Sequence, residues 1–393
     1  MKTLILGLGA QGSVIASHLT KDEEVTEVRL ADIDLVKAER LAMRLKNDKV
    51  CTHRVDASKV EEIVEVAKGV DLVVNATSFV WKLIENSMEA AIKVGANYID
   101  LAGSRQLQFN EKWRDAGLTA LIGAGEDPGI SNILAREGAD MLDRIDEIRI
   151  KDWGSIESTE IIFGWCPPTV WSDLAASPSI YVNGEHKRLS PFSGEEVYKF
   201  PDPIGQQTVF HHAHEEVGTL SRFIEGVKYV EFKLGTPEVP IAKFIIGLGL
   251  MKREPIEVGG VKVTPRDVLI ALTPPTLTMD EVEEKIKAGI LTDEQECILV
   301  EVKGEKAGKE MKITFYTTMS LHEANKLLPG ATGVAYLTGT SGAVFAKMLL
   351  NAQITTRGAI PPECLTRGER TAYLGNLAKM GIIIHEKVER TIN

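Results

Sequence analysis

Three glycines near the N-terminus are spaced for binding a dinucleotide. Gly7, Gly9 and Gly12 form a Gly-x-Gly-x-x-Gly motif between a short apolar run and a segment with helical spacing. In such a strand–turn–helix unit the first glycine permits a tight turn, the second lets the backbone approach a pyrophosphate, and the third allows close helix–strand packing. The amides at the helix start then face the phosphates, so we also expect contacts from Ala10 and Gln11.

A carboxylate further along predicts that the dinucleotide is NAD. Asp32 ends the second expected strand, where it can accept hydrogen bonds from the ribose hydroxyls and repel a 2′-phosphate. Arg29, on the same strand, keeps NADP possible. Asp56 either reaches the adenine or caps a helix. The end of the fourth expected strand is expected beside the nicotinamide half, through Asn75, Ala76 and Thr77.

A cluster of titratable residues predicts acid–base chemistry. The segment His211-His212-Ala213-His214-Glu215-Glu216 holds three of the eight histidines of the chain. Histidine suits proton transfer because its pKa lies near operating pH. We expect His214 and Glu215 to be catalytic and His212 to line the substrate pocket; surface histidines without a role are the alternative. The spacing also allows a metal site, but hydride transfer needs none, so no metal is predicted.

Three further residues are candidates for the same pocket. Asp127 follows the sixth expected strand and is expected to be catalytic, facing the nicotinamide or a substrate amine; its alternative is a turn residue. Asp100 ends the fifth strand, where it either holds a substrate ammonium or is structural. Arg222 is expected to clamp a substrate carboxylate, since its planar fork binds bidentately, unless it forms a surface salt bridge.

Apolar patterning predicts the elements that position these residues. In the first 125 residues, apolar runs alternate with segments of helical spacing. Strands that alternate with helices of this length pair in parallel, so we expect an α/β fold with a doubly wound Rossmann sheet. The expected strands cover residues 3–6, 27–31, 50–55, 71–75, 98–101 and 119–122.

After residue 125 the strand-like segments come closer together, and a hairpin is expected from residues 297–303 and 311–317 around a polar turn. This pattern predicts an α+β second domain with a mostly antiparallel sheet. We expect a dinucleotide-binding domain at 1–125, a substrate-binding domain at 126–350, and a C-terminal segment at 351–393 that returns to the Rossmann domain.

Composition excludes several classes of partner. The formal net charge of −11 over 393 residues argues against nucleic-acid or anionic-membrane partners. No apolar run reaches the roughly 18 residues of a membrane span. The four cysteines lack paired spacing, which fits a reducing compartment, and no signal-peptide pattern is present. The cytoplasm is the expected location.

Several short motifs, in the same order, resemble the saccharopine dehydrogenase and lysine 6-dehydrogenase family. They include Val73-Val74-Asn75-Ala76, Ile99-Asp100-Leu101-Ala102-Gly103, and the segments 125–129, 219–222, 264–268 and 357–363. The resemblance implies a homodimeric NAD(P)-dependent oxidoreductase that transfers hydride between a C–N carbon of an amino acid and nicotinamide. It also implies that the second domain forms the dimer sheet and half of the pocket for a small amino-acid or amine substrate.

The substrate stays open at this point. Where the lysine 6-dehydrogenases carry small residues, this chain has residues 211–216, whose His-Glu pair looks more like the saccharopine branches. The leading hypothesis is a saccharopine dehydrogenase-like or lysine 6-dehydrogenase-like enzyme, in which a base frees the amine of a proton before hydride leaves. The alternatives are a polyamine-forming carboxyamine dehydrogenase and a non-catalytic dinucleotide-binding sensor.

Overall fold

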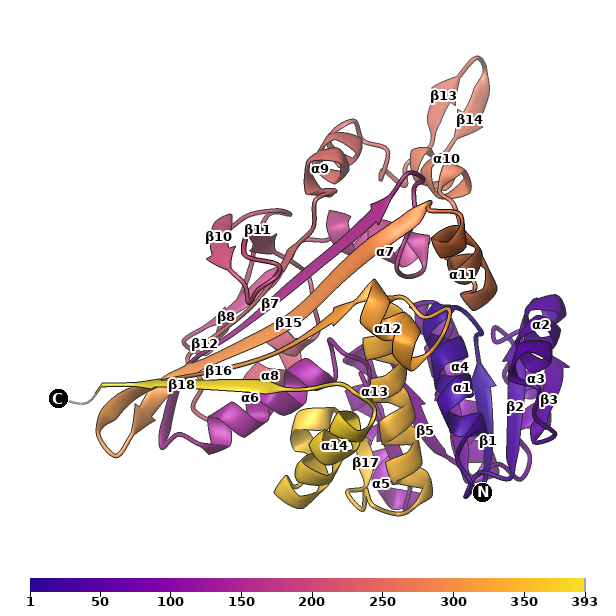
Figure 1. The fold of residues 1–393 in the computed structure, drawn as a ribbon, viewed down its shortest axis with the longest axis horizontal. Coiled ribbons are helices and arrows are strands. Elements are labelled where there is room, and N and C mark those ends of the chain that lie inside the picture. The colour runs from indigo at the N-terminus through magenta and orange to yellow at the C-terminus, as the bar shows by residue number, and fades with distance from the viewer. Residues whose placement is uncertain (392–393) are drawn as a thin grey trace.

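The structure, a computed structural model, describes residues 1–391. Its first sheet has seven parallel strands in the order β17-β6-β5-β4-β1-β2-β3 (Figure 1). The strand order reverses between β1 and β4, which is the switch point where open α/β sheets bind ligands. The predicted Rossmann sheet is confirmed. Its strands are β1 (Lys2–Leu6), β2 (Glu27–Asp32), β3 (Val50–Arg54), β4 (Leu72–Asn75), β5 (Asn97–Asp100), β6 (Thr119–Leu121) and β17 (Gly358–Ile360).

Helices cover both faces of this sheet because alternate strand residues feed two apolar cores. Ile5 packs in one core with residues of α1, α2 and α13, whereas Leu4 and Leu6 pack in the other with residues of α3, α4 and α5. The helices are α1 (Ala10–Thr20), α2 (Leu35–Leu45), α3 (Val60–Ala67), α4 (Trp81–Val94), α5 (Asn110–Asp115), α13 (Gly333–Leu350) and the 3₁₀ turn η1 (Arg105–Phe109).

The second sheet has nine strands, and its long central strands cross Figure 1 diagonally. All its pairings are antiparallel except β12 with β7, and the predicted hairpin is present as β15 and β16. The strands are β7 (Arg144–Ser158), β8 (Ser179–Val182), β9 (Glu185–Arg188), β10 (Glu196–Lys199), β11 (Gln206–His211), β12 (Tyr229–Gly235), β15 (Leu291–Lys306), β16 (Lys309–Ser320) and β18 (His385–Arg390).

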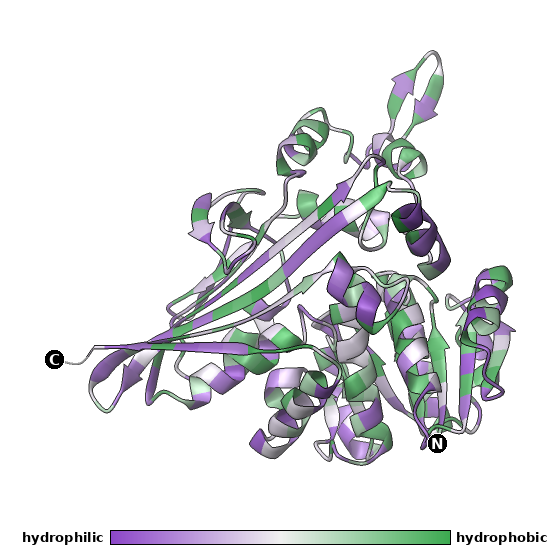
Figure 2. Cartoon of the chain, in the orientation of Figure 1, coloured by the Kyte–Doolittle hydropathy of each residue, from purple (hydrophilic) through white to green (hydrophobic). Residues whose placement is uncertain are grey.

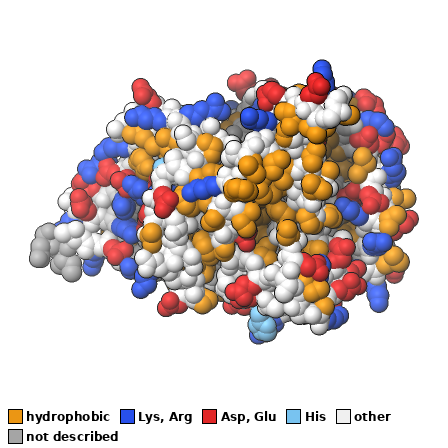
Figure 3. Space-filling model, turned by 90° about the horizontal axis from the view of Figure 1, so that it is seen from above, with side chains coloured by type: hydrophobic (Ala, Val, Ile, Leu, Met, Phe, Trp, Pro, Cys, Tyr) orange, Lys and Arg blue, Asp and Glu red, His pale blue; other side chains and the backbone are white. Residues whose placement is uncertain are grey.

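The remaining elements surround this sheet. Helices α6 (Ile130–Asp140) and α8 (Glu216–Phe223) pack on its inner face, toward the Rossmann sheet. At the top of Figure 1, α9 (Val239–Gly247) and α10 (Pro265–Leu272) carry exposed apolar side chains, which are part of the hydrophobic surface seen from above in Figure 3. The other elements are α7 (Pro167–Ala175), α11 (Met279–Lys287), α12 (Leu321–Leu327), α14 (Arg367–Lys379), η2 (Pro362–Cys364), β13 (Ile256–Val258) and β14 (Val261–Val263).

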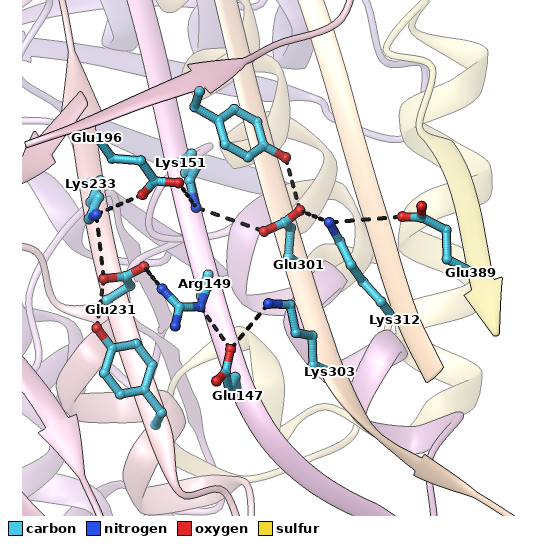
Figure 4. Close-up of polar contacts among 12 residues, drawn as sticks. Glu147, Arg149, Lys151, Glu196, Glu231, Lys233, Glu301, Lys303, Lys312 and Glu389 are labelled. Atoms are coloured by element: carbon cyan, nitrogen blue, oxygen red, sulfur yellow. Dashed lines mark hydrogen bonds and ion pairs between the residues drawn. The ribbon is translucent and has the colours of Figure 1, made fainter. Parts of the chain in front are cut away.

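The long strands of the nine-stranded sheet show hydrophilic and hydrophobic bands in alternation (Figure 2), and a group of charged side chains lies on their outer face. On β7, Ile150 points to the inner core while Lys151 points outward. The side chain of Lys151 is only 1% exposed, and its Nζ lies 3.7 Å from Glu196 and 3.8 Å from Glu301 (Figure 4). Lys151 on β7 is thus paired with carboxylates of β10 and of β15, as buried charges must be.

The chain after residue 320 contributes strands to both sheets. Helix α13 packs along α1 so closely that a Cβ added at Gly339 would lie 2.5 Å from the Cβ of Val14. Strand β17 pairs with β6 of the Rossmann sheet, but β18 pairs with β16 of the second sheet. Of the described residues 351–391, only part therefore packs on the Rossmann sheet. The domain boundaries stay a prediction, and α13, just before the expected boundary at 350, is buried on nearly all sides and fills space between α1 and the second sheet.

Candidate active site

A cavity of about 560 Å³ lies between the two sheets, at the carboxyl ends of β1, β2 and β4. From the Rossmann side it is lined by the glycine turn, Asp32 and Thr77. From the other side it is lined by Asp152 on β7, Glu296 on β15 and residues 212–215 between β11 and α8. The cavity therefore joins the expected cofactor end to polar groups of the second sheet.

The three motif glycines have different surroundings. Gly7 has a φ of +86°, and a Cβ there would lie 2.6 Å from the carbonyl oxygen of Ala76. A Cβ at Gly12 would lie 2.0 Å from the carbonyl oxygen of Gly7. At Gly9, by contrast, no heavy atom lies within 4 Å of the added Cβ. Helix α1 begins at Ala10 without a side-chain cap, so its first amides border this open space, and the loop fits a pyrophosphate.

The cofactor-side predictions divide into lining and supporting residues. The Asp32 carboxylate accepts hydrogen bonds from the backbone N–H of Leu8 at 2.8 Å and of Asp34 at 3.0 Å, which fixes it at the end of β2. Asp56 lines the cavity, and its carboxylate accepts from the backbone N–H and the hydroxyl of Ser58. It does not cap α3, because the N-cap residue of that helix is Lys59. The predicted residues that line the cavity here are Gly7, Gly9, Ala10, Gln11, Asp32, Asp56, Ala76 and Thr77.

Two residues predicted to bind the cofactor do not line the cavity but pack behind residues that do. Gly12 is buried against Gly7. Asn75 donates to the hydroxyl of Tyr98 at 3.0 Å and accepts from the hydroxyl of Thr77 at 2.7 Å, so it positions Thr77. Both residues support the site without lining the cavity.

His214 is held by a buried carboxylate. Its Nδ1 lies 2.5 Å from Oε2 of Glu216, and its ring stacks on Phe232 with 4.1 Å between centroids. Glu216 is fully buried and accepts a hydrogen bond from the hydroxyl of Ser131 at 2.8 Å. Because Glu216 occupies Nδ1, Nε2 is the nitrogen left for proton exchange with a substrate.

The two cavity histidines have opposite protonation preferences. Burial alone disfavours the His214 imidazolium, but the carboxylates of Glu216, Asp127 and Glu215 outweigh it and raise the pKa of His214 well above its ordinary value. Burial and the charge of His214 lower the pKa of His212 to about 3. His214 is therefore the charged partner, and His212 is neutral.

Four cavity carboxyls were missed in the sequence. Burial raises the pKa of Asp152 to about 6 and that of Asp173 to about 7, and burial with neighbouring carboxylates raises the pKa of Glu126 and Glu296 well above the usual range. A signal for two of them was available. Asp152 and Glu296 continue the inward-facing apolar positions of their strands, where a carboxylate is unusual.

Two substrate-binding predictions are corrected by the structure. Asp100 is buried and does not line the cavity. Its carboxylate accepts hydrogen bonds from the Tyr98 hydroxyl at 2.9 Å, from the Gln106 side-chain amide at 2.9 Å and from the backbone N–H of Gly123 at 3.0 Å. Its acceptors are used internally, so its role is structural. Arg222 is exposed and does not line the cavity, because Val217 and Leu220 turn the opposite face of α8 to the core.

Comparison with known families decides what this site belongs to. Residues 3–121 match the saccharopine dehydrogenase NADP binding domain, and residues 125–382 match the saccharopine dehydrogenase C-terminal domain. The chain belongs to the saccharopine dehydrogenase family. It is thus an NAD(P)-dependent oxidoreductase that acts on a C–N bond, as the sequence motifs predicted.

Relatives in this family cover nearly the whole chain. Carboxyaminopropylagmatine dehydrogenase of Synechocystis sp. is 24% identical over 406 residues, with 98% of each chain covered. Carboxynorspermidine synthase of Vibrio alginolyticus is 25% identical over 416 residues, covering 98% of this chain and 96% of that one. The structure of apo saccharopine dehydrogenase (L-Glu forming) from Saccharomyces cerevisiae has a TM-score of 0.73 at 16% identity, covering 99% of each chain. That structural likeness shows the fold.

For this member of the saccharopine dehydrogenase family, Asp32→Ala is expected to weaken NADH binding more than NADPH binding. The variant loses a charged acceptor for the ribose hydroxyls, which corresponds to roughly a tenfold loss for NADH or more. Arg29 cannot compensate, because it donates to Glu27 and to the carbonyl oxygens of Val66 and Lys68.

Fluorescence titration with both reduced cofactors checks this prediction. Equal losses for NADH and NADPH would contradict the assignment of Asp32 to the ribose. Lys37→Ala is the matched control, because Lys37 is the one lysine or arginine lining the cavity in the described part of the chain. It is the cation available to a 2′-phosphate, so its loss should affect NADPH.

The carboxylates around His214 also have a spacing that metals can use. Asp127, His214 and Glu216 offer ligand atoms that all lie within 4.8 Å of one another. The hydrogen bond from His214 Nδ1 to Glu216 accounts for the closest pair without an ion. The absence of a metal site stays a prediction.

Proposed function

We propose that this enzyme forms or splits the secondary-amine C–N bond of a carboxylated polyamine. The observation that carries the proposal is the acidic lining of the cavity. Glu126, Asp127, Asp152, Asp173, Glu215 and Glu296 line it, while no lysine or arginine of the described residues lines it apart from Lys37 on α2. Such a cavity favours a substrate with several cationic amines.

The same acidic lining argues against saccharopine, and it favours lysine less than a polyamine because lysine carries fewer amino groups. An amine that joins two amino acids carries at least two carboxylates, and these need cationic partners. Arg222, expected to supply one, lies outside the cavity. Lysine and saccharopine therefore become the alternatives, and the carboxyamine hypothesis leads. The names of the curated relatives, carboxyaminopropylagmatine dehydrogenase and carboxynorspermidine synthase, support this order.

His214 carries the proton chemistry in this proposal. When bound at the glycine loop, nicotinamide supplies or accepts the hydride. A carbon–nitrogen double bond accepts hydride readily only when its nitrogen is protonated. His214 can donate that proton, because its raised pKa keeps the imidazole protonated. In the oxidative direction His214 must first lose that proton to act as the base. The resting site is therefore set for reductive amine formation.

The test of the function is a panel of substrates followed by the absorbance of NAD(P)H. A carboxylated aldehyde with a diamine should consume NAD(P)H, and a carboxylated polyamine should regenerate it. Turnover of lysine or saccharopine in place of these compounds would overturn the proposal. NADH binding without turnover of any amine would favour the sensor hypothesis.

The pH dependence should follow the state of His214. Its protonated form is present below its raised pKa, so reductive kcat is expected to fall, and oxidative kcat to rise, as pH increases through that pKa. Glu216→Gln removes the nearest carboxylate and should move both limbs to lower pH by about one unit or more. Profiles of kcat against pH for the two proteins check this, and unmoved limbs would contradict the pairing.

The homodimer implied by the family resemblance stays a prediction. Among the described residues, no helix is long and apolar enough to cross a membrane.

A further inference from the structure

Three buried carboxyl groups converge in the cavity from three separate elements. Glu126 follows β6, Asp152 lies on β7 and Glu296 lies on β15. Glu296 is opposite Gly154 in the strand pairing, and a Cβ at Gly154 would come within 2.8 Å of its Oε2. The glycine thus leaves room for the Glu296 carboxyl beside Asp152, with which it is hydrogen-bonded.

Two of these carboxyls have an oxygen without a partner. Oε2 of Glu126 and Oδ1 of Asp152 are buried and form no hydrogen bond, although the two residues are only 3% and 6% exposed. A buried polar atom without a hydrogen-bond partner destabilises the fold, more so when it is charged, so these two oxygens call for an explanation. Both residues line the cavity, where a bound cation would satisfy these oxygens.

The neighbouring acids do not share this feature. Glu294, next along the same face of β15, accepts hydrogen bonds from the backbone N–H of Gly333 and, at 3.4 Å, of Val334, at the start of α13. Asp127 is hydrogen-bonded to Asp152, and its carboxylate lies within 4.8 Å of a ring nitrogen of His214. The unpaired oxygens therefore mark one place in the cavity, next to the proton-transfer group.

We propose that Glu126, Asp152 and Glu296 form a subsite for the primary ammonium group at the unreactive end of the amine substrate. The inference rests on the proposed function and deepens it by assigning the second cation of the substrate to these residues. In the free enzyme Glu296 and Asp152 share a proton in their hydrogen bond. A bound ammonium group can supply N–H donors in place of that proton, which couples this subsite to substrate recognition.

The arrangement selects ammonium over guanidinium. A guanidinium group pairs best with both oxygens of one carboxylate in a planar fork. Here the two unpaired oxygens belong to different carboxyls. The carboxyl of Glu126 is also hydrogen-bonded to Thr338, and that of Asp152 to Asp127 and Glu296, so neither offers both of its oxygens to a ligand. Single oxygens from separate elements match the three N–H donors of an ammonium group.

Isothermal titration of the full-length, NADH-saturated protein tests the subsite without requiring turnover. The probes are putrescine, n-butylamine and butylguanidine. Wild-type protein should bind putrescine about tenfold or more tightly than n-butylamine, and n-butylamine more tightly than butylguanidine. Asp152→Asn and Glu296→Gln should each remove most of the advantage of putrescine, while Glu225→Gln, at an exposed position outside the cavity, should leave it unchanged.

Thermal melting separates this role from a structural one. Both amide variants replace a buried acid by a neutral group of the same shape that can still hydrogen-bond, so the melting temperature of the amine-free protein should stay level or rise while putrescine affinity falls. Putrescine selectivity retained in both variants would overturn the subsite. Tighter binding of butylguanidine would overturn the ammonium assignment. Selective putrescine binding without turnover of any carboxylated polyamine would overturn the proposed function while leaving the subsite in place.

Discussion

Replacement of His214 by alanine is expected to lower kcat by roughly 10²–10⁴-fold, the usual contribution of a positioned acid–base group. NAD(P)H affinity should change little, because His214 lines the cavity from the second sheet and the glycine loop is intact in this variant. Stopped-flow turnover together with cofactor titration measures both quantities. Wild-type turnover in the variant would remove His214 from the mechanism.

Two further variants locate this effect. The double variant His214→Ala/Glu216→Gln should be no slower than His214→Ala alone, since Glu216 acts through the imidazole. Arg222→Ala is the matched control, because this exposed side chain lies outside the cavity. A loss of turnover in that control would return Arg222 to the site.

Adding one methyl group at Gly12 is expected to disrupt the N-terminal domain, whereas the same change at Gly9 should leave the fold intact. The Cβ of Gly12→Ala would meet the backbone carbonyl oxygen of Gly7 at 2.0 Å, inside the first turn, where neither group can move aside. We expect a loss of about 3 kcal/mol or more in the free energy of unfolding. The Cβ of Gly9→Ala meets nothing within 4 Å and points into the space assigned to the pyrophosphate.

Thermal melting and NADH titration of the two variants check this contrast. Gly12→Ala should melt at a clearly lower temperature, while Gly9→Ala should melt like the wild type but bind NADH about tenfold more weakly or worse. A stable Gly12→Ala protein, or unchanged NADH affinity in Gly9→Ala, would contradict the roles given to these glycines.

The parts of this structure that depend on local sequence could be predicted. The Rossmann sheet follows from runs whose period changes between strand and helix, and Gly7, Gly9 and Asp32 lie where that fold requires them. The cluster around His214 was found because its residues are adjacent in the chain. Such patterns carry their information within short segments.

The remaining features depend on contacts between distant segments. Glu126 and Glu296 lie far apart in the sequence, and only the packing of the two sheets brings them into one cavity. Asp100 and Arg222 were assigned to the substrate from residue type alone. Asp100 instead accepts hydrogen bonds from Tyr98 and Gln106, and the orientation of α8 leaves Arg222 exposed. Neither partner choice nor helix orientation can be deduced from residue type.

The place of β17 and α13 in the Rossmann half has a consequence for synthesis of the chain. The first six strands are complete by residue 121, yet the edge of β6 and the face of α1 are covered only by residues after 332. While the ribosome makes the intervening segment, the nascent first half exposes an unpaired strand edge and an apolar helix face. Native assembly of the Rossmann half therefore has to wait for residues after 332, and we expect such long-range closure to slow folding and to leave the unfinished half prone to aggregation.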